Sequence, residues 1–122
     1  KRLQKGMERA YQYYRQDLSN YRELENYKRL SDLSEFKESP KEGIKSSGYV
    51  VNTLEAAIWC LLHSHSYKET VLMAVNLGED TDTVGAVAGG LAGLYYKEEG
   101  IPKEWLQVLQ RREWIEEVLQ GI

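Results

Sequence analysis

Three oxygen-bearing side chains, Asp80, Asp82 and Thr83, lie within four residues of one another in the sequence. Carboxylate and hydroxyl oxygens are the ligands that hard cations such as Mg²⁺ and Ca²⁺ prefer. At the start of a helix, these positions can direct three oxygens to one place. Asp and Thr are also ordinary helix caps, but Glu79 adds a further acid. Neighbouring acids repel one another unless a cation or a proton lies among them, so we expect this cluster to bind a metal ion.

The segment that follows the acids is apolar and rich in glycine. Gly85, Gly89 and Gly93 recur every four residues, so they lie on one face of a helix predicted for residues 81–97. Each glycine inside a helix costs about 0.8–1 kcal/mol relative to alanine. This cost favours a face that packs very closely against another backbone or a ligand.

Two other motifs share part of this pattern. An EF-hand loop is excluded, because Val84 and Gly85 stand where further oxygen ligands are required. A phosphatase site of the haloacid dehalogenase type resembles Asp-x-Asp-x-Val/Thr, with Asp80 as nucleophile and Asp82 as acid and base. That motif must follow a core strand, whereas the residues before Asp80 have a helical pattern. It remains the weaker alternative.

The elements that must position these residues are predicted to be helices, and the fold class is all-α. Residues 1–30 repeat apolar side chains every three or four positions, with a possible division at Ser19-Asn20. Residues 31–48 are polar and predict a loop, with at most a helical turn around Leu33–Lys37. Residues 49–122 predict a succession of helices, and no segment alternates as a strand does.

Capping signals give the boundaries of the later helices. Asn52 with Glu55 predicts the start of a helix that is apolar almost all round and belongs in the core. Ser66 with Glu69 predicts the start of the next helix. Gly78 and Gly100 are expected to end helices, and Pro102 is expected in the first turn of another helix. Residues 112–119 predict the last helix.

The composition limits the possible functions. The 122 residues suffice for one domain, and the net charge of −3 argues against a general nucleic-acid binder. No apolar run approaches the ~20 residues of a membrane span. The single cysteine, Cys60, excludes an internal disulfide and favours a reducing, cytoplasmic compartment. His63 and His65 are too closely spaced to share a helix face, so they are expected to be ordinary residues at a helix end rather than zinc ligands.

The acidic and glycine-rich residues 78–93 resemble the C-terminal signature of the ADP-ribosylglycohydrolase family, which includes dinitrogenase reductase-activating glycohydrolase. Two more blocks are similar to that family: the sequence from Gly48 to Trp59, and the tail with residues 100–105 and 112–115. The three blocks fall in the family's order and cover about residues 44–122.

The resemblance implies part of an orthogonal multi-helix bundle that holds two Mg²⁺ ions, with Mn²⁺ as a possible substitute. It implies hydrolysis of the bond between ADP-ribose and a modified protein side chain or another ADP-ribose. By the same resemblance, Asp80, Asp82 and Thr83 are metal ligands, and Asp82 bridges both ions. Gly48 and Tyr49 are implied to contact the ribose or adenosine of the substrate, although Tyr49 could equally cover a helix start.

The chain departs from the family pattern where the other metal ligands are expected. The family's Gly-Asp-x-x-Gly and Thr-Asp-Asp-Thr segments are absent, and the sequence starts at Lys1 without a methionine. We therefore expect residues 1–122 to be a single domain or the C-terminal half-domain of such an enzyme, inactive without its N-terminal half. Its expected partners are that half and an ADP-ribosylated protein or ADP-ribose derivative.

A chain lacking half of its fold should expose packing surface. Trp59, Leu61 or the glycine face would then be free to drive formation of a homodimer. The alternative function is a non-catalytic helical interaction module that keeps the fold of the family.

Overall fold

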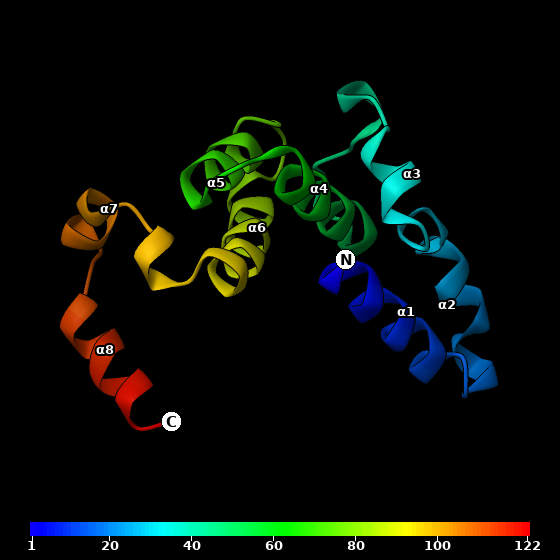
Figure 1. The fold of residues 1–122 in the computed structure, drawn as a ribbon, viewed down its shortest axis with the longest axis horizontal. Coiled ribbons are helices and arrows are strands. Elements are labelled where there is room, and N and C mark those ends of the chain that lie inside the picture. The colour runs from blue at the N-terminus through cyan, green and yellow to red at the C-terminus, as the bar shows by residue number, and fades with distance from the viewer.

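A computed structural model describes residues 1–122 as a curved succession of helices (Figure 1). It has eight α-helices, four 3₁₀-helices and no strand, which confirms the all-α prediction. The α-helices are α1 (Arg2–Tyr14), α2 (Tyr21–Asn26), α3 (Leu33–Lys37), α4 (Val50–His63), α5 (Tyr67–Val75), α6 (Thr81–Tyr96), α7 (Lys103–Val108) and α8 (Arg112–Gln120). The 3₁₀-helices are η1 (Leu18–Asn20), η2 (Lys28–Leu30), η3 (Lys41–Gly43) and η4 (Glu98–Gly100).

The core lies in the middle of this succession, where α4, α5 and α6 pack against one another (Figure 1). The centre of α4 is almost completely buried, as its apolar sequence predicted. Ala74 of α5 and Val84 and Ala88 of α6 are also fully buried in the same cluster. The three helices thus form the packed centre of the molecule, and the N- and C-terminal segments extend from it.

Helix α6 places its spaced glycines against α5. A Cβ at Gly85 would lie 3.0 Å from Val75 Cγ1, and one at Gly89 would lie 3.4 Å from Tyr67 Oη. A Cβ at Gly93 would also meet the Tyr67 ring, at 3.9 Å. The prediction of one closely packed face is confirmed. The expectation that this face would be left exposed is wrong, because side chains of α5 occupy the space that the missing Cβ atoms leave.

The N-terminal helices attach to α4 through buried apolar residues and one ion pair. Leu30, Leu33 and Phe36 are buried in the core cluster. Arg29 Nη1 donates a hydrogen bond of 2.6 Å to Glu55 Oε2, and the guanidinium lies 5.4 Å from the centre of the Phe36 ring. Residues 31–48 contain α3 and η3, so the predicted helical turn at Leu33–Lys37 is confirmed within the expected loop.

One predicted capping box is wrong and the other is confirmed. Helix α4 begins at Val50, so Asn52 lies inside its first turn, and Glu55 pairs with Arg29 instead of capping the helix. The Glu55 carboxylate, which the local sequence pattern predicted as part of a helix cap, instead forms a long-range ion pair with Arg29. At α5, Ser66 Oγ accepts a hydrogen bond of 3.1 Å from the Glu69 amide, as predicted.

The indole of Trp59 is not exposed, contrary to expectation. Its residue is 7% exposed, and its Nε1 donates a hydrogen bond of 2.9 Å to the carbonyl of Ser39. The ring stacks on His63 at 4.1 Å between centroids. The segment before α4 folds back over the helix and covers this face. His63, the last residue of α4, is half-buried, and His65, two residues beyond it, is exposed. Both are the partly exposed residues at a helix end that the sequence predicted.

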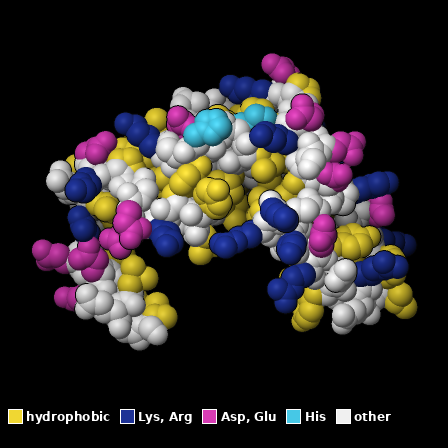
Figure 2. Space-filling view, in the orientation of Figure 1, with side chains coloured by type: hydrophobic (Ala, Val, Ile, Leu, Met, Phe, Trp, Pro, Cys, Tyr) yellow, Lys and Arg dark blue, Asp and Glu magenta, His cyan; other side chains and the backbone are white.

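Helices α7 and α8 extend away from the core (Figure 1) and contain no buried residue. Trp114 and Leu119 of α8 are 60% and 62% exposed. Hydrophobic side chains are visible on the inner side of this arm in Figure 2. No helix is long and apolar enough to cross a membrane.

Candidate metal and substrate site

The predicted metal ligands begin at the turn between α5 and α6. Asp80 is the N-cap residue of α6, but no amide of the first helical turn donates a capping hydrogen bond to its carboxylate. Capping by side chains stabilises a helix by about 1 kcal/mol, and Asp80 makes no such contribution here. The side chains of Asp82 and Thr83 lie close enough to this carboxylate to lower its pKa, and its role as a metal ligand stays a prediction.

The turn that leads to Asp80 has an unusual backbone. Gly78 has φ of 95° and Glu79 has φ of 53°. Glycine adopts such angles readily, whereas a left-handed conformation costs a residue with a Cβ about 1–2 kcal/mol. The turn at Glu79 is therefore held by contacts outside itself, and those contacts lie in the segment before α4.

Residues Ser46 to Gly48 supply these contacts. The Asp80 amide donates a hydrogen bond of 3.1 Å to the Ser46 carbonyl, and Ser46 Oγ donates one of 2.8 Å to the Gly78 carbonyl. A Cβ at Gly48 would lie 2.8 Å from Asp80 Oδ2. The fold thus brings Gly48, a predicted substrate contact, directly against Asp80, a predicted metal ligand.

Tyr49 occupies the next position and is the N-cap residue of α4. The residue is 53% exposed, so its ring is accessible to a ligand as well as lying at a helix start. Both roles considered for Tyr49 are compatible with this position. The N-termini of α4 and α6 are joined here through the Ser46–Asp80 hydrogen bond.

The acidic residues of the cluster interact with one another. Hydrogen bonding by the carboxyl group of Asp82, and next by the hydroxyl of Thr83, holds the pKa of the Asp80 carboxyl below its ordinary value. Asp82 and Thr83 are exposed, and Asp82 Oδ1 accepts a hydrogen bond of 2.9 Å from the Thr83 amide. When both carboxyl groups are ionised they repel each other, and a bound cation would remove that repulsion.

The oxygen donors of Asp80, Asp82 and Thr83 fit magnesium in kind, since Mg²⁺ prefers carboxylate and hydroxyl ligands and keeps several waters. They do not fit it in number. No group of three or more His, Cys, Asp or Glu side chains is placed to hold a metal ion. Asp80, Asp82 and Thr83 therefore stay a prediction as metal ligands, and they are too few to complete a metal site. The phosphatase alternative is wrong, because the protein has no strand to precede Asp80.

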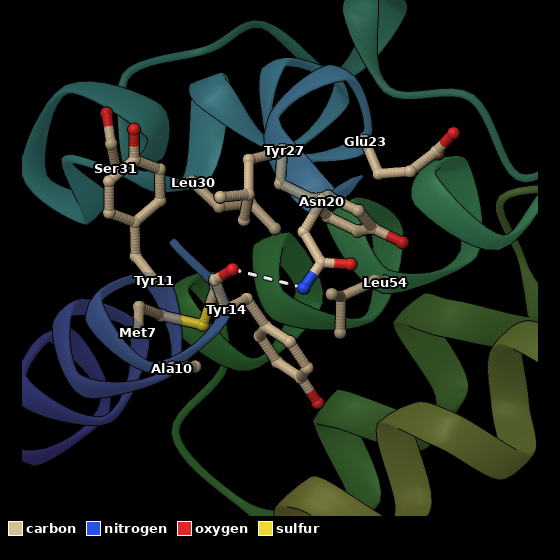
Figure 3. A pocket seen from close by; sticks show the side chains of 11 residues that line it. Met7, Ala10, Tyr11, Tyr14, Asn20, Glu23, Tyr27, Leu30, Ser31 and Leu54 are labelled. Atoms are coloured by element: carbon tan, nitrogen blue, oxygen red, sulfur yellow. Dashed lines mark hydrogen bonds between the residues drawn. The ribbon is translucent and has the colours of Figure 1, made fainter. Parts of the chain in front are cut away.

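A separate apolar cleft of about 450 Å³ lies between α1, α2 and α4 (Figure 3). Its lining includes Met7, Tyr11, Tyr14, Leu24 and Leu54, and none of the predicted site residues. Two residues of its lining are joined by a hydrogen bond of 3.1 Å from Asn20 Nδ2 to the Tyr14 carbonyl. Its hydrophobic lining lacks the cluster of polar groups that an ADP-ribose site requires.

Sequence reasoning missed two residues of the site, Ser46 and Ser47. Ser47 Oγ accepts a hydrogen bond of 2.8 Å from Asn52 Nδ2, and the Ser47 carbonyl accepts one of 3.1 Å from Thr53 Oγ1. The only local signal was a pair of serines before glycine, which is typical of any loop. The partners of Ser46 at positions 78 and 80 are more than 30 residues away and could not be inferred from that signal.

The family model for ADP-ribosylglycohydrolase matches residues 1–122. The chain is 41% identical over 93 residues to ADP-ribosylarginine hydrolase Tri1 of Serratia proteamaculans, covering 76% of this chain and 25% of that protein. It is 36% identical to ADP-ribosyl-[dinitrogen reductase] glycohydrolase of Rhodospirillum rubrum, covering 64% of this chain and 26% of that protein.

A more distant relative is ADP-ribosylhydrolase ARH3 of Gallus gallus, 30% identical over 75% of this chain and 28% of that protein. The chain thus spans about a quarter of the length of the curated relatives it matches. The glycine-rich helix, the acidic turn and the Gly48 segment form one connected structure in a chain matched throughout its length. The protein belongs to the ADP-ribosylglycohydrolase family.

Proposed function

We propose that this chain is part of a magnesium-dependent ADP-ribosylglycohydrolase that cleaves the glycosidic bond joining ADP-ribose to a modified protein side chain or to another ADP-ribose. The observation that carries the proposal is the contact of Gly48 with the Asp80 carboxylate. It joins a loop suited to contact substrate with a cluster suited to bind metal. The Serratia proteamaculans relative is named an ADP-ribosylarginine hydrolase, which supports a modified arginine as one substrate.

In this proposal, Asp80, Asp82 and Thr83 hold one face of the magnesium site, and Gly48 and Tyr49 contact the substrate. Bound Mg²⁺ would neutralise charge and hold a water for hydrolysis. The residues of this chain supply oxygen ligands and fix their position next to the Gly48 segment. The remaining ligands would come from the part of the family fold that lies outside the chain.

Metal binding is tested by the melting temperature of the chain with and without Mg²⁺. We expect Mg²⁺ to raise it, because binding to the folded state alone stabilises that state. The rise should vanish in Asp82→Asn. Asp32→Asn is the matched control, since Asp32 caps α3 and asparagine caps a helix about as well. A wild-type melting temperature that does not respond to Mg²⁺ or Mn²⁺ would overturn the proposal that these three residues bind the metal without the rest of the family fold.

The chain by itself is proposed to be inactive, because its three oxygen ligands are too few for two ions. This is measured as release of ADP-ribose from an ADP-ribosylarginine peptide in the presence of Mg²⁺. Turnover by the isolated chain would contradict the proposal. A lack of turnover that persists after addition of the rest of a family protein would instead favour the alternative function, a non-catalytic interaction module.

The exposed apolar side of α8 supports association of the isolated chain. Trp114, Val118 and Leu119 are all about half exposed or more, and such faces drive self-association when no partner covers them. We propose a homodimer formed through this arm. Light scattering should give twice the mass of the chain at high concentration, and Trp114→Gln should restore the monomer. A monomeric wild-type chain would refute it.

We also propose a cytoplasmic location. The single cysteine, Cys60, is buried, and burial raises the pKa of its thiol to about 11, so it is poorly suited to form a disulfide with another chain. A protein that relies on no disulfide is typical of a reducing compartment. Fractionation of cells that express the complete protein tests the location.

A further inference from the structure

Ser46 holds both ends of the turn that leads to Asp80. Its Oγ donates a hydrogen bond of 2.8 Å to the Gly78 carbonyl, and its own carbonyl accepts one of 3.1 Å from the Asp80 amide. The residue is 3% exposed, so water does not compete for these bonds. One buried serine therefore fixes the first and last residues of a three-residue turn.

The turn requires such a contact because of its backbone angles. Glu79 lies between the two held residues with φ of 53°, a conformation that residues with a Cβ disfavour. Without the hydroxyl of Ser46, the Gly78 carbonyl would lose its partner, and Glu79 would be free to relax toward negative φ. That rotation would move the Asp80 backbone, and the carboxylate would move with it.

Ser46 is itself connected to the core through its neighbour in the sequence. Its neighbour Ser47 accepts two hydrogen bonds from the first turn of α4. Asn52 Nδ2 donates one of 2.8 Å to Ser47 Oγ, and Thr53 Oγ1 donates one of 3.1 Å to the Ser47 carbonyl. Thr53 is 5% exposed, and the helix beyond it forms the centre of the core. The position of Asp80 is thus set relative to α4 through the Ser46–Ser47 segment and not only by the sequence of α6.

We propose that Ser46 is a positioning residue for Asp80. It contacts neither substrate nor metal in this role, and acts through the backbone of residues 78–80. The consequence for magnesium affinity rests on the proposed function, whereas the consequence for the Asp80 backbone does not. The two consequences are measured separately.

The test uses Ser46→Ala, with Ser64→Ala as the matched control. Ser64 is also buried, at 7%, and its Oγ makes a hydrogen bond of 2.6 Å with Thr70 Oγ1 at the start of α5. Both variants lose one buried hydroxyl and should be destabilised similarly, but only one touches the turn. Ser46→Thr keeps the hydroxyl and serves as the conservative variant.

The first measurement is hydrogen exchange of the Asp80 amide by NMR, without metal. In Ser46→Ala, the exchange rate of the Asp80 amide, divided by that of amides in the middle of α4, should be about tenfold higher than in wild type. Ser64→Ala should leave that ratio unchanged, and Ser46→Thr should restore most of the protection. An unchanged ratio in Ser46→Ala, or an equal increase in Ser64→Ala, would overturn the proposal.

The second measurement is the Mg²⁺ concentration at half-saturation, followed by the amide shifts of residues 81–83. It should rise about fivefold in Ser46→Ala, corresponding to the loss of one hydrogen bond, and stay unchanged in Ser64→Ala. If wild type shows no Mg²⁺ response, the proposed metal function fails while the exchange ratio still decides the role of Ser46. If Mg²⁺ binds and the midpoint does not change in Ser46→Ala, the positioning role is refuted.

Discussion

Gly48 and the Asp80 carboxylate are in direct contact across the junction of α4 and α6: a Cβ at position 48 would lie 2.8 Å from Oδ2 of Asp80. Real Cβ atoms do not approach an oxygen so closely, so Gly48→Ala must displace the carboxylate. We expect this variant to raise the Mg²⁺ concentration at half-saturation about tenfold or more. The free energy of unfolding should change by less than about 1 kcal/mol. Isothermal titration and urea denaturation measure the two effects.

Gly43→Ala is the control for this variant. Position 43 lies in the same polar segment, and its Cβ would meet only Pro40 Cγ, at an ordinary 3.9 Å. Metal affinity should be that of wild type. Equal Mg²⁺ affinity in Gly48→Ala and Gly43→Ala would show that Asp80 is not a ligand or that its position does not matter.

The glycines of α6 should differ in their response to alanine. Nothing lies within 4 Å of a Cβ at Gly90, whereas a Cβ at Gly85 would meet Val75 Cγ1 at 3.0 Å. Gly90→Ala should therefore stabilise the chain by about 0.8–1 kcal/mol, the usual gain in a helix interior. Gly85→Ala should gain less than half of that or lose stability, because Val75 must move. Urea denaturation of both variants decides, and equal gains would contradict the observed packing of α5 on α6.

Glu55 makes the stability of the chain depend on pH. Burial raises the pKa of its carboxyl above the ordinary 4.5, and Arg29 opposes this shift only in part. Because the folded chain binds this proton more tightly than the unfolded chain, the free energy of unfolding contributed by Glu55 is highest below pH 4.5. It falls as pH rises through the raised pKa. Unfolding measured from pH 4 to 7 should show a smaller decrease in Glu55→Gln than in wild type.

The control for this pH series is Glu35→Gln, an exposed glutamate of α3. Its pH dependence should follow that of wild type. An equal fall in the free energy of unfolding of Glu55→Gln and wild type between pH 4 and 7 would contradict a raised pKa of Glu55.

Arg29 should be needed most when Glu55 is ionised. The ion pair joins an Arg29 side chain that is 46% exposed to a Glu55 side chain that is 5% exposed. Arg29→Met leaves the buried carboxylate without its partner, so we expect a loss on the order of 1–3 kcal/mol at pH 7. The loss should be smaller at pH 4.5. The double variant with Glu55→Gln should recover much of it, because no unpaired charge remains. A double-mutant cycle measures this coupling, and additive losses would exclude it.

Local patterns in the sequence were sufficient for much of the fold. Ser66 caps α5 through a contact within one helical turn, and the apolar run of α4 is buried because a helix that is apolar almost all round must pack in the core. The pattern failed where a distant residue competed for the same group. Glu55 was assigned to a cap, but Arg29, 26 residues earlier, binds it. Trp59 was expected to be exposed, but the Ser39 carbonyl accepts its indole hydrogen bond.

The sequence by itself determined that the chain is helical, and it predicted Asp80, Asp82 and Thr83 as ligands of a hard cation. These follow from side-chain chemistry and short spacing, which do not depend on the rest of the fold. Only the tertiary structure decided that side chains of α5 pack on the glycines of α6, and that Ser46 and Gly48 lie against the turn that leads to Asp80. These contacts join residues at least ten positions apart, and those of Ser46 and Gly48 with the turn join residues more than 30 positions apart. The packing of α4, α5 and α6 against one another, rather than any local propensity, brings them together.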